Sequence, residues 1–282
     1  MAIDIGISCT IIPTYPPHYG YTISAIITHN QFVKSDLYII FTNSQDYTLF
    51  NETISTLNLT YLRWKFLILD FIPRPQDNII TIKKFYAVEK LLNLYKYVAV
   101  FDSEILFVKP FDTDAVYKRI DDSMIFKSNK RHNSNHLFDL CSIMKYENNE
   151  TLISETESFT QYWWFNEICV YEKEKFLEFY QWFKTHKDYD SIINKFMSFD
   201  YLIYSIWLIC NKQYKLKKHL KNYSLAGAAV ETNYCDDSVS YEFMSYQDRN
   251  INHAKIDHIK VQIMIDRDIN HCLKEGERRW IG

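Results

Sequence analysis

The sequence predicts an α/β fold with a mostly parallel central sheet flanked by helices, followed by an irregular C-terminal half. Two patterns in the N-terminal part of the chain carry this prediction. Short apolar runs of strand length alternate with segments whose apolar residues recur every three or four positions, as they do in helices. The runs are apolar on both faces, which is typical of parallel strands covered by helices on both sides.

Strands and helices alternate over the first part of the chain. The strands are expected at residues 5–12, 37–42, 66–72 and 97–101. The helices are expected at residues 19–32, in the polar stretch after Asn43, and at residues 82–95. Pro13 and Pro73 end the first and third apolar runs, and Asn43 is a residue type that commonly caps the start of a helix.

The pattern weakens in the second half of the chain. Strands are expected at residues 124–126 and 163–171, and a helix with one aromatic face at residues 176–183. Residues 199–210 are apolar almost all round and too short to span a membrane, which indicates a helix buried in the core. We therefore expect one domain over residues 1–282.

Composition excludes several classes of protein. A formal net charge of −3 over 282 residues gives no field that would draw the chain to nucleic acid. The chain has only 5 glycines, and none lies between Gly20 and Gly227. Phosphate-binding loops built on clustered glycines are therefore absent from the sequence, which excludes Rossmann dehydrogenases, P-loop NTPases and protein kinases.

The sequence also predicts a cellular location. Its 6 cysteines are dispersed, as expected for reduced thiols in a reducing compartment. The N-terminus has no signal-peptide pattern, and no apolar run approaches the roughly 20 residues that span a bilayer, so we expect a cytoplasmic protein. Residues 212–221, from Lys212 to Lys221, form a basic segment that is a candidate contact with the inner face of an anionic membrane. The alternative is a solvated helix or strand face.

An acidic motif follows the fourth predicted strand. Asp102, Ser103 and Glu104 lie where the chain leaves residues 97–101, and ligands of open parallel sheets bind at the carboxyl ends of the strands. Two carboxylates one residue apart can share a hard cation such as Mg²⁺ or Mn²⁺. Such a cation neutralises a diphosphate without a glycine-rich loop. The alternative is that both acids end the strand and face solvent.

The sequence around this motif, YKYVAVFDSEILFVKPFD, resembles the metal-binding segment of GT-A-fold glycosyltransferases, most of all bacterial enzymes akin to family 8. The similar stretch covers residues 83–112. The resemblance implies a GT-A-like fold, a nucleotide-sugar donor, a saccharide or lipid-linked acceptor, and Mn²⁺ or Mg²⁺ as cofactor. It also implies a donor-binding half over residues 1–112 and an acceptor-binding half over residues 113–282. A composition typical of an AT-rich genome suggests bacterial surface polysaccharide synthesis, although a viral chain would look similar.

The resemblance also implies roles for single residues. Asp102 contacts the ribose or metal-bound water, and Glu104, which stands where the family has a second aspartate, is the direct metal ligand. The family's third ligand is a histidine near the C-terminus. His258 is the choice here, although the family's HxxGxxKPW context is missing around it.

Other residues are expected at the donor. The loop with Thr14 and Tyr15 meets the nucleobase in the family, and Lys83 and Lys84 lie in the helix whose basic residues approach the diphosphate. The alternatives are a surface tyrosine and a solvated helix face.

A transferase also needs a base or a group that stabilises an oxocarbenium-like transition state. The candidates are Glu167, in the aromatic segment WWFNE, and Asp200, at the start of the buried helix. The alternatives are an outward-facing acid on a core strand for Glu167 and a helix cap for Asp200. As functions for the whole chain, a nucleotidyltransferase and a non-catalytic carbohydrate-binding protein also stay open.

Overall fold

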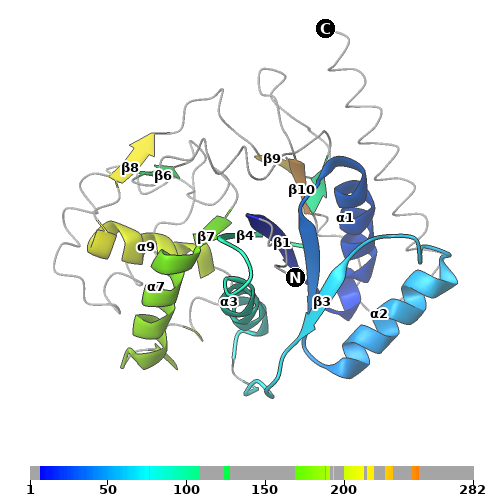
Figure 1. The fold of residues 1–282 in the computed structure, drawn as a ribbon, viewed down its shortest axis with the longest axis horizontal. Helices are drawn as coiled ribbons and strands as arrows, with labels where there is room; N and C mark the ends of the chain where they lie inside the picture. The colour runs from blue at the N-terminus through cyan, green and yellow to red at the C-terminus, as the bar shows by residue number, and fades with distance from the viewer. Residues whose placement is uncertain are drawn as a thin grey trace, which may run out of the picture.

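The computed structural model describes residues 7–75, 77–103, 105–107, 124–127, 169–187, 189–190, 193, 200–212, 215–218, 226–230 and 243–247. A five-stranded sheet with the order β3-β2-β1-β4-β7 lies at its centre (Figure 1). The strands are β1 (Ser8–Pro13), β2 (Asp36–Phe41), β3 (Lys65–Ile68), β4 (Tyr97–Val100) and β7 (Cys169–Glu172). The first four are parallel, and β7 runs antiparallel to β4. The predicted α/β fold class with a mostly parallel sheet is confirmed.

Helices cover both faces of this sheet. They are α1 (Tyr19–Phe32), α2 (Ser44–Thr56), α3 (Ile79–Leu91), α7 (Lys173–Thr185) and α9 (Asp200–Lys212). One apolar cluster joins α1 and α2 to the sheet through side chains such as Ile23 and Phe50. A second cluster joins α3, α7 and α9 to the sheet through Phe85, Phe179 and Trp207. Figure 1 shows the two groups of helices on opposite sides of the central strands.

Two smaller sheets complete the described structure. Strand β5 (Ile105–Phe107) runs antiparallel to β10 (Phe243–Gln247), which pairs in parallel with β9 (Ala226–Val230). Strand β6 (Met124–Lys127) pairs in parallel with β8 (Lys215–Lys218). These segments come from the half of the chain in which the sequence pattern is weak.

The strand order places one pair of strand ends at a topological switch point. From β1 the chain moves outward to β2 and β3, then crosses back through α3 to place β4 on the other side of β1. Strands β1 and β4 lie in parallel register, with Ile11 opposite Val100. In open α/β sheets ligands bind outside the carboxyl ends of the strands at such a reversal. A ligand is therefore expected beside the residues that follow β1 and β4.

Two sequence predictions differ from the structure. The third strand was expected at residues 66–72 but ends at Ile68, and Ile72 is 95% exposed. The last apolar residues of the predicted run, Phe71 and Ile72, therefore lie in a loop before Pro73. Helix α1 has the expected bounds but is buried on most sides rather than amphipathic. Strand β5 packs beside it, and the Phe107 amide donates a hydrogen bond to Thr28 Oγ1 at 3.2 Å.

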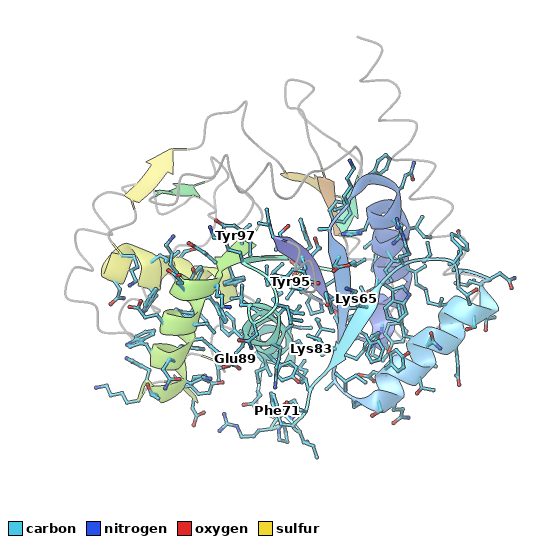
Figure 2. All side chains as sticks on the ribbon, viewed as in Figure 1. Lys65, Phe71, Lys83, Glu89, Tyr95 and Tyr97 are labelled. Atoms are coloured by element: carbon cyan, nitrogen blue, oxygen red, sulfur yellow. The ribbon has the colours of Figure 1, made fainter. Side chains whose placement is uncertain are left out.

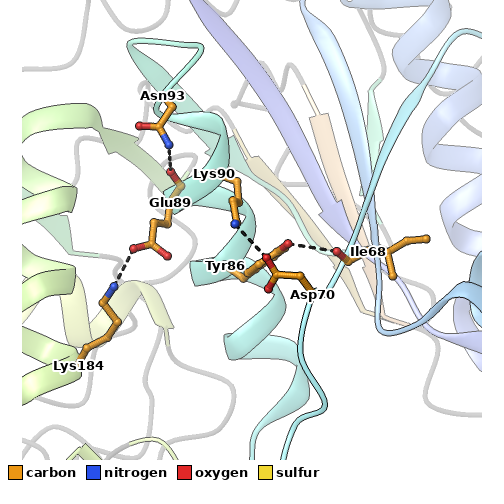
Figure 3. Close-up of polar contacts among 7 residues, drawn as sticks. All are labelled: Ile68, Asp70, Tyr86, Glu89, Lys90, Asn93 and Lys184. Atoms are coloured by element: carbon orange, nitrogen blue, oxygen red, sulfur yellow. Dashed lines mark hydrogen bonds and ion pairs between the residues drawn. The ribbon is translucent and has the colours of Figure 1, made fainter.

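Helix α3 is fixed from both sides (Figure 3). Towards β3, Tyr86 Oη donates to the Ile68 carbonyl at 3.2 Å and Lys90 pairs with Asp70 at 3.0 Å. Towards α7, Glu89 pairs with Lys184 at 2.7 Å. These contacts, together with the buried Phe85, hold the helix in one orientation on the sheet.

Across the described ranges, no helix combines the length and apolar character needed to cross a membrane.

Candidate functional site at the ends of β1 and β4

The loop after β1 is short and held at several points. The Thr14 amide donates to the Ile40 carbonyl at 3.1 Å, which continues the pairing of β1 with β2. The Thr14 hydroxyl lies 2.6 Å from that of Thr22 in α1, and both side chains are buried. Tyr15 is extended and is followed by the 3-10 turn η1 (Pro16–His18), in which proline fixes the backbone. The loop is thus ordered before any ligand binds.

The end of β4 lies beside this loop. The Phe101 amide donates to the Ile11 carbonyl at 3.0 Å, so β4 stays next to β1 up to the point where it ends. The Asp102 side chain is 50% exposed, whereas Ser103 is buried. Ser103 Oγ lies 2.7 Å from Nδ1 of His18. The residues that follow β1 and β4 are therefore in direct contact.

His18 is a site residue that the sequence reasoning missed. Its Nε2 atom lies 2.5 Å from the Tyr15 hydroxyl, and the two rings pack at a tilt with centroids 4.1 Å apart. Its other nitrogen reaches Ser103, as described above. The available signal was its position in the loop after the first strand, close to Tyr15. Nothing in the local sequence indicates the contact with Ser103, because that contact depends on the pairing of β1 with β4.

Two lysines of α3 reach the same edge of the sheet. Lys83 is fully buried, and its Nζ donates to the Thr14 carbonyl at 2.5 Å. Burial lowers the pKa of Lys83 to about 8, and the negative charge of Asp46 opposes this shift only in part. The Lys84 Nζ lies 2.9 Å from Asp102 Oδ1. Figure 2 labels Lys83 on α3.

A solvated helix face, the alternative considered for these two lysines, is wrong. Lys83 is 0% and Lys84 6% exposed. The reason is the position of α3, whose start lies under the loop after β1 rather than at the surface. Asn78 caps this helix by accepting hydrogen bonds from the amides of Ile80 at 3.1 Å and Thr81 at 3.3 Å.

The described residues supply part of the predicted metal site. Asp102 offers a hard carboxylate oxygen at a partly exposed strand end, which fits Mg²⁺ or Mn²⁺. Glu104 and His258, the other predicted ligands, lie outside the described residues. In the parts of the chain that the structure describes, no group of three His, Cys, Asp or Glu side chains could hold a metal ion.

The predicted catalytic acids and the basic segment belong to later parts of the chain. Asp200 is the first residue of α9, and Glu167 lies outside the described residues. Lys212, at the end of α9, pairs with Glu178 at 2.6 Å and lies 5.5 Å from the centre of the Trp207 ring. Residues 215–218 of the basic segment form β8, which pairs with β6. Contact with a membrane stays a prediction.

The chemistry of this edge suits an anionic ligand with an aromatic part. It combines the ring of Tyr15, the hydroxyls of Thr14, Tyr15 and Ser103, the partly exposed carboxylate of Asp102, and the buried ammonium groups of Lys83 and Lys84. Lys84 is balanced by Asp102, whereas the hydrogen bond of Lys83 goes to a carbonyl. A buried cation with a strongly shifted pKa next to a ligand-binding edge is a common mark of a functional site.

Comparison with known proteins gives only distant likenesses. No family model matches the sequence, and no curated protein matches it. The structure of galactosyltransferase LgtC with donor and acceptor sugar analogs has a TM-score of 0.45 at 10% identity, covering 92% of this chain and 95% of that chain. Core-mannan synthase A (CmsA/Ktr4) from Aspergillus fumigatus, in an Mn/GDP form, has a TM-score of 0.41 at 13% identity, covering 79% and 77%. TM-scores below 0.5 do not establish a shared fold.

Proposed function

We propose that this chain is a glycosyltransferase that moves a sugar from a nucleotide diphosphate donor to a saccharide or lipid-linked acceptor. The observation that carries the proposal is the meeting of the two strand ends at the switch point, where Tyr15, Lys84 and Asp102 surround one edge of the sheet. This is where nucleotides bind in open α/β sheets. The resemblance of residues 83–112 to GT-A enzymes favours sugar transfer over other nucleotide chemistry.

The donor is assigned to the residues after β1 and β4. The ring of Tyr15 stacks on the nucleobase, because an aromatic face suits any base, and Thr14 sits at the same loop. Asp102 and Ser103 contact the ribose side of the nucleotide. Lys84 lies near the diphosphate, where its charge is balanced by Asp102 until the ligand arrives.

Charge on the diphosphate is the main electrostatic problem of this reaction. A divalent cation, Mn²⁺ or Mg²⁺, held by Asp102 and Glu104 with His258 as a further ligand, would neutralise the diphosphate and support its departure. The chain's own contribution is the two lysines of α3. Because they are buried, their charges act through a medium of lower dielectric than water and attract an anion more strongly.

The remaining roles belong to the acceptor half. We assign Asp200 and Glu167 as the candidates for activating the acceptor hydroxyl or stabilising the sugar cation in the transition state. Replacing each acid by its amide separates a catalytic role from a structural one. A catalytic acid loses activity at unchanged stability, whereas a helix cap at Asp200 loses about 1 kcal/mol of stability. Surface polysaccharide synthesis at the cytoplasmic face of a membrane is the cellular role that we propose.

The proposal is tested by thermal unfolding of the full chain with UDP, GDP, ADP or CDP, with and without Mn²⁺. A ligand at 100 times its Kd stabilises the folded state by about 2.7 kcal/mol, which for a chain of this size raises the Tm by roughly 5 °C or more. The rise is expected only with Mn²⁺ present, and Glu104→Ala removes it. Glu89→Ala, which removes an acid paired with Lys184, is the matched control. If no diphosphate shifts the wild-type transition, nucleotide binding is refuted.

Donor turnover then separates the enzyme classes. A glycosyltransferase hydrolyses its nucleotide-sugar slowly when no acceptor is present. A nucleotidyltransferase instead releases pyrophosphate from a nucleoside triphosphate and a sugar phosphate. A carbohydrate-binding protein does neither, so that result would overturn the assignment as an enzyme.

A further inference from the structure

Three side chains at the candidate site form a continuous hydrogen-bonded chain. The imidazole of His18 stands in the middle, 2.5 Å from the hydroxyl of Tyr15 and 2.7 Å from that of Ser103. Tyr15 belongs to the loop after β1, and Ser103 follows β4. A single side chain therefore connects the two strand ends between which a ligand at the switch point must bind.

Imidazole is well suited to join two hydroxyl groups. Each hydroxyl can donate or accept a hydrogen bond, so either neutral tautomer of His18 satisfies both contacts, and the protonated ring donates to both. The connection is therefore expected to persist whichever form the ring takes. It is a structural link between the two loops.

The link fixes the ring of Tyr15 as well as its hydroxyl. The rings of Tyr15 and His18 pack at a tilt, with centroids 4.1 Å apart and an interplanar angle of 30°. Tyr21 contacts the imidazole edge-on at 5.6 Å, and the backbone of His18 is closed onto the Tyr15 carbonyl by a hydrogen bond of 2.8 Å. The Tyr15 ring is thus packed against the His18 ring.

We propose that His18 is a positioning residue that holds Tyr15 and Ser103 in the arrangement that a nucleoside diphosphate meets on binding. The identity of the ligand rests on the proposed function; the link between the loops rests on the contacts alone. Ordering a flexible side chain on binding weakens affinity, and a side chain that is already ordered avoids this loss. Removing His18 is expected to weaken nucleoside diphosphate binding roughly 3- to 10-fold.

The binding test uses isothermal titration of the full chain with the nucleoside diphosphate that stabilises it, in the presence of Mn²⁺. His18→Ala is expected to raise the Kd, and Tyr15→Phe and Ser103→Ala are expected to raise it less. In the His18→Ala background Tyr15→Phe has little further effect, because the Tyr15 hydroxyl acts through the same ring, whereas Ser103→Ala keeps only the part that comes from its own contact with the nucleotide. The proposal is overturned if His18→Ala binds like the wild type, or if the effects of His18→Ala and Tyr15→Phe simply add.

Conservative variants separate positioning from general stability. Asn at position 18 keeps a polar group near the place of Nδ1, and Gln keeps one near the place of Nε2. His18→Asn and His18→Gln are each expected to recover part of the affinity that His18→Ala loses. His186→Ala, which removes a histidine whose ring packs at a tilt against Trp182 at the end of α7, is the matched control with wild-type affinity. Equal losses in all three His18 variants would contradict the proposal.

Hydrogen exchange of the ligand-free chain tests the link independently of any nucleotide. His18→Ala is expected to speed exchange of the amides at positions 14, 15 and 18 and at residues 101–103 but not in α7. Unchanged exchange in both segments refutes the link, whatever the binding data show. Faster exchange in a protein that binds no nucleoside diphosphate would instead leave the link standing and refute the proposed function.

Discussion

The two ends of the parallel sheet both carry ionised side chains, but they balance them differently. At the amino end, Asp36 accepts hydrogen bonds from Lys65 at 2.8 Å and from the Tyr95 hydroxyl at 2.5 Å. At the carboxyl end, Lys84 pairs with Asp102, while the buried Lys83 bonds to the Thr14 carbonyl. At the amino end the acid is thus paired with a base. The carboxyl end has one such pair and, in addition, a buried cation, Lys83, that is bonded to a carbonyl.

The pKa values reflect the same difference. Partial burial alone would raise the pKa of Asp36, but the hydrogen bonds from Lys65 and Tyr95 outweigh it and lower that pKa. The hydrogen bond to Asp36 raises the pKa of Lys65. Burial instead lowers the pKa of Lys83 to about 8. A network whose charges stabilise one another supports the fold, whereas a charge held against its own preference is suited to binding an anion.

The largest expected effect compares the two lysine-paired aspartates. Asp102→Asn should lower transfer or donor hydrolysis by about 10²- to 10³-fold, because it removes a carboxylate that we propose holds the divalent cation on the diphosphate. Asp36→Asn should leave the activity per folded molecule unchanged and lower stability by about 1 kcal/mol, since its ion pair is partly exposed. Initial rates and urea unfolding of both variants measure this. Equal activity losses would remove the functional distinction between the two ends.

Much of the sheet and its helices, including the end of β4 where Asp102 lies, could be predicted from the sequence. The alternation of apolar runs and helical segments located β1, β2, β4, α1 and α3, and the N-cap expected at Asn43 is confirmed by its bond to the Asp46 amide. Placing Asp102 at the end of β4 followed from the same pattern. These are local properties, because strand, helix and cap signals depend on residues that are close in sequence.

The parts that the sequence did not predict depend on distant contacts. The link from His18 to Ser103 exists only because β4 pairs with β1. Lys83 was expected near the diphosphate, with a solvated helix face as the alternative, but its burial under the loop after β1 and its hydrogen bond to the Thr14 carbonyl were not predicted. The strand predicted to reach Ile72 ends at Ile68, and Phe71 and Ile72 lie exposed in the loop that follows. Periodicity in one segment cannot report which other segment lies over it.

The second expected effect concerns the buried cation at the carboxyl end. The pKa of Lys83 is about 8 in the folded chain and 10.5 when unperturbed, so between these values the unfolded state binds more protons. Wild-type stability should therefore rise relative to Lys83→Met by up to about 3 kcal/mol as the pH increases from about 8 to about 10.5. Urea unfolding across this range measures the difference.

Lys65 provides the control for that experiment. Its pKa is raised, so its stabilisation is fully present below the ordinary value of 10.5 and is lost only above it. The difference between wild type and Lys65→Met should stay constant over the range in which the Lys83→Met difference changes. If both differences are flat, Lys83 does not titrate as a buried cation.

A third effect is expected at the amino end, in acid. His29 is buried in α1 near Asp36, and burial lowers its pKa to about 3 although the Asp36 charge opposes this. The unfolded state takes up a proton on His29 below about pH 6.5, whereas the folded state does not. The free energy of unfolding of the wild type should therefore fall by about 2 kcal/mol between pH 6.5 and about pH 5. His29→Leu removes this part of the pH dependence, whereas His186→Leu, at the end of α7, keeps it. Identical acid slopes in all three proteins would contradict the assignment.

The smallest expected effect compares two helix caps. Asn43 caps α2 through the Asp46 amide at 2.8 Å, and Asn78 caps α3 through the amides of Ile80 and Thr81. Each change to Ala should lower the free energy of unfolding by about 1 kcal/mol. Only α3 carries Lys83, so only Asn78→Ala is expected also to weaken nucleoside diphosphate binding, by roughly 2- to 3-fold. Calorimetric unfolding and titration of both variants decide this, and equal affinities would mean that the start of α3 does not position the lysines for the ligand.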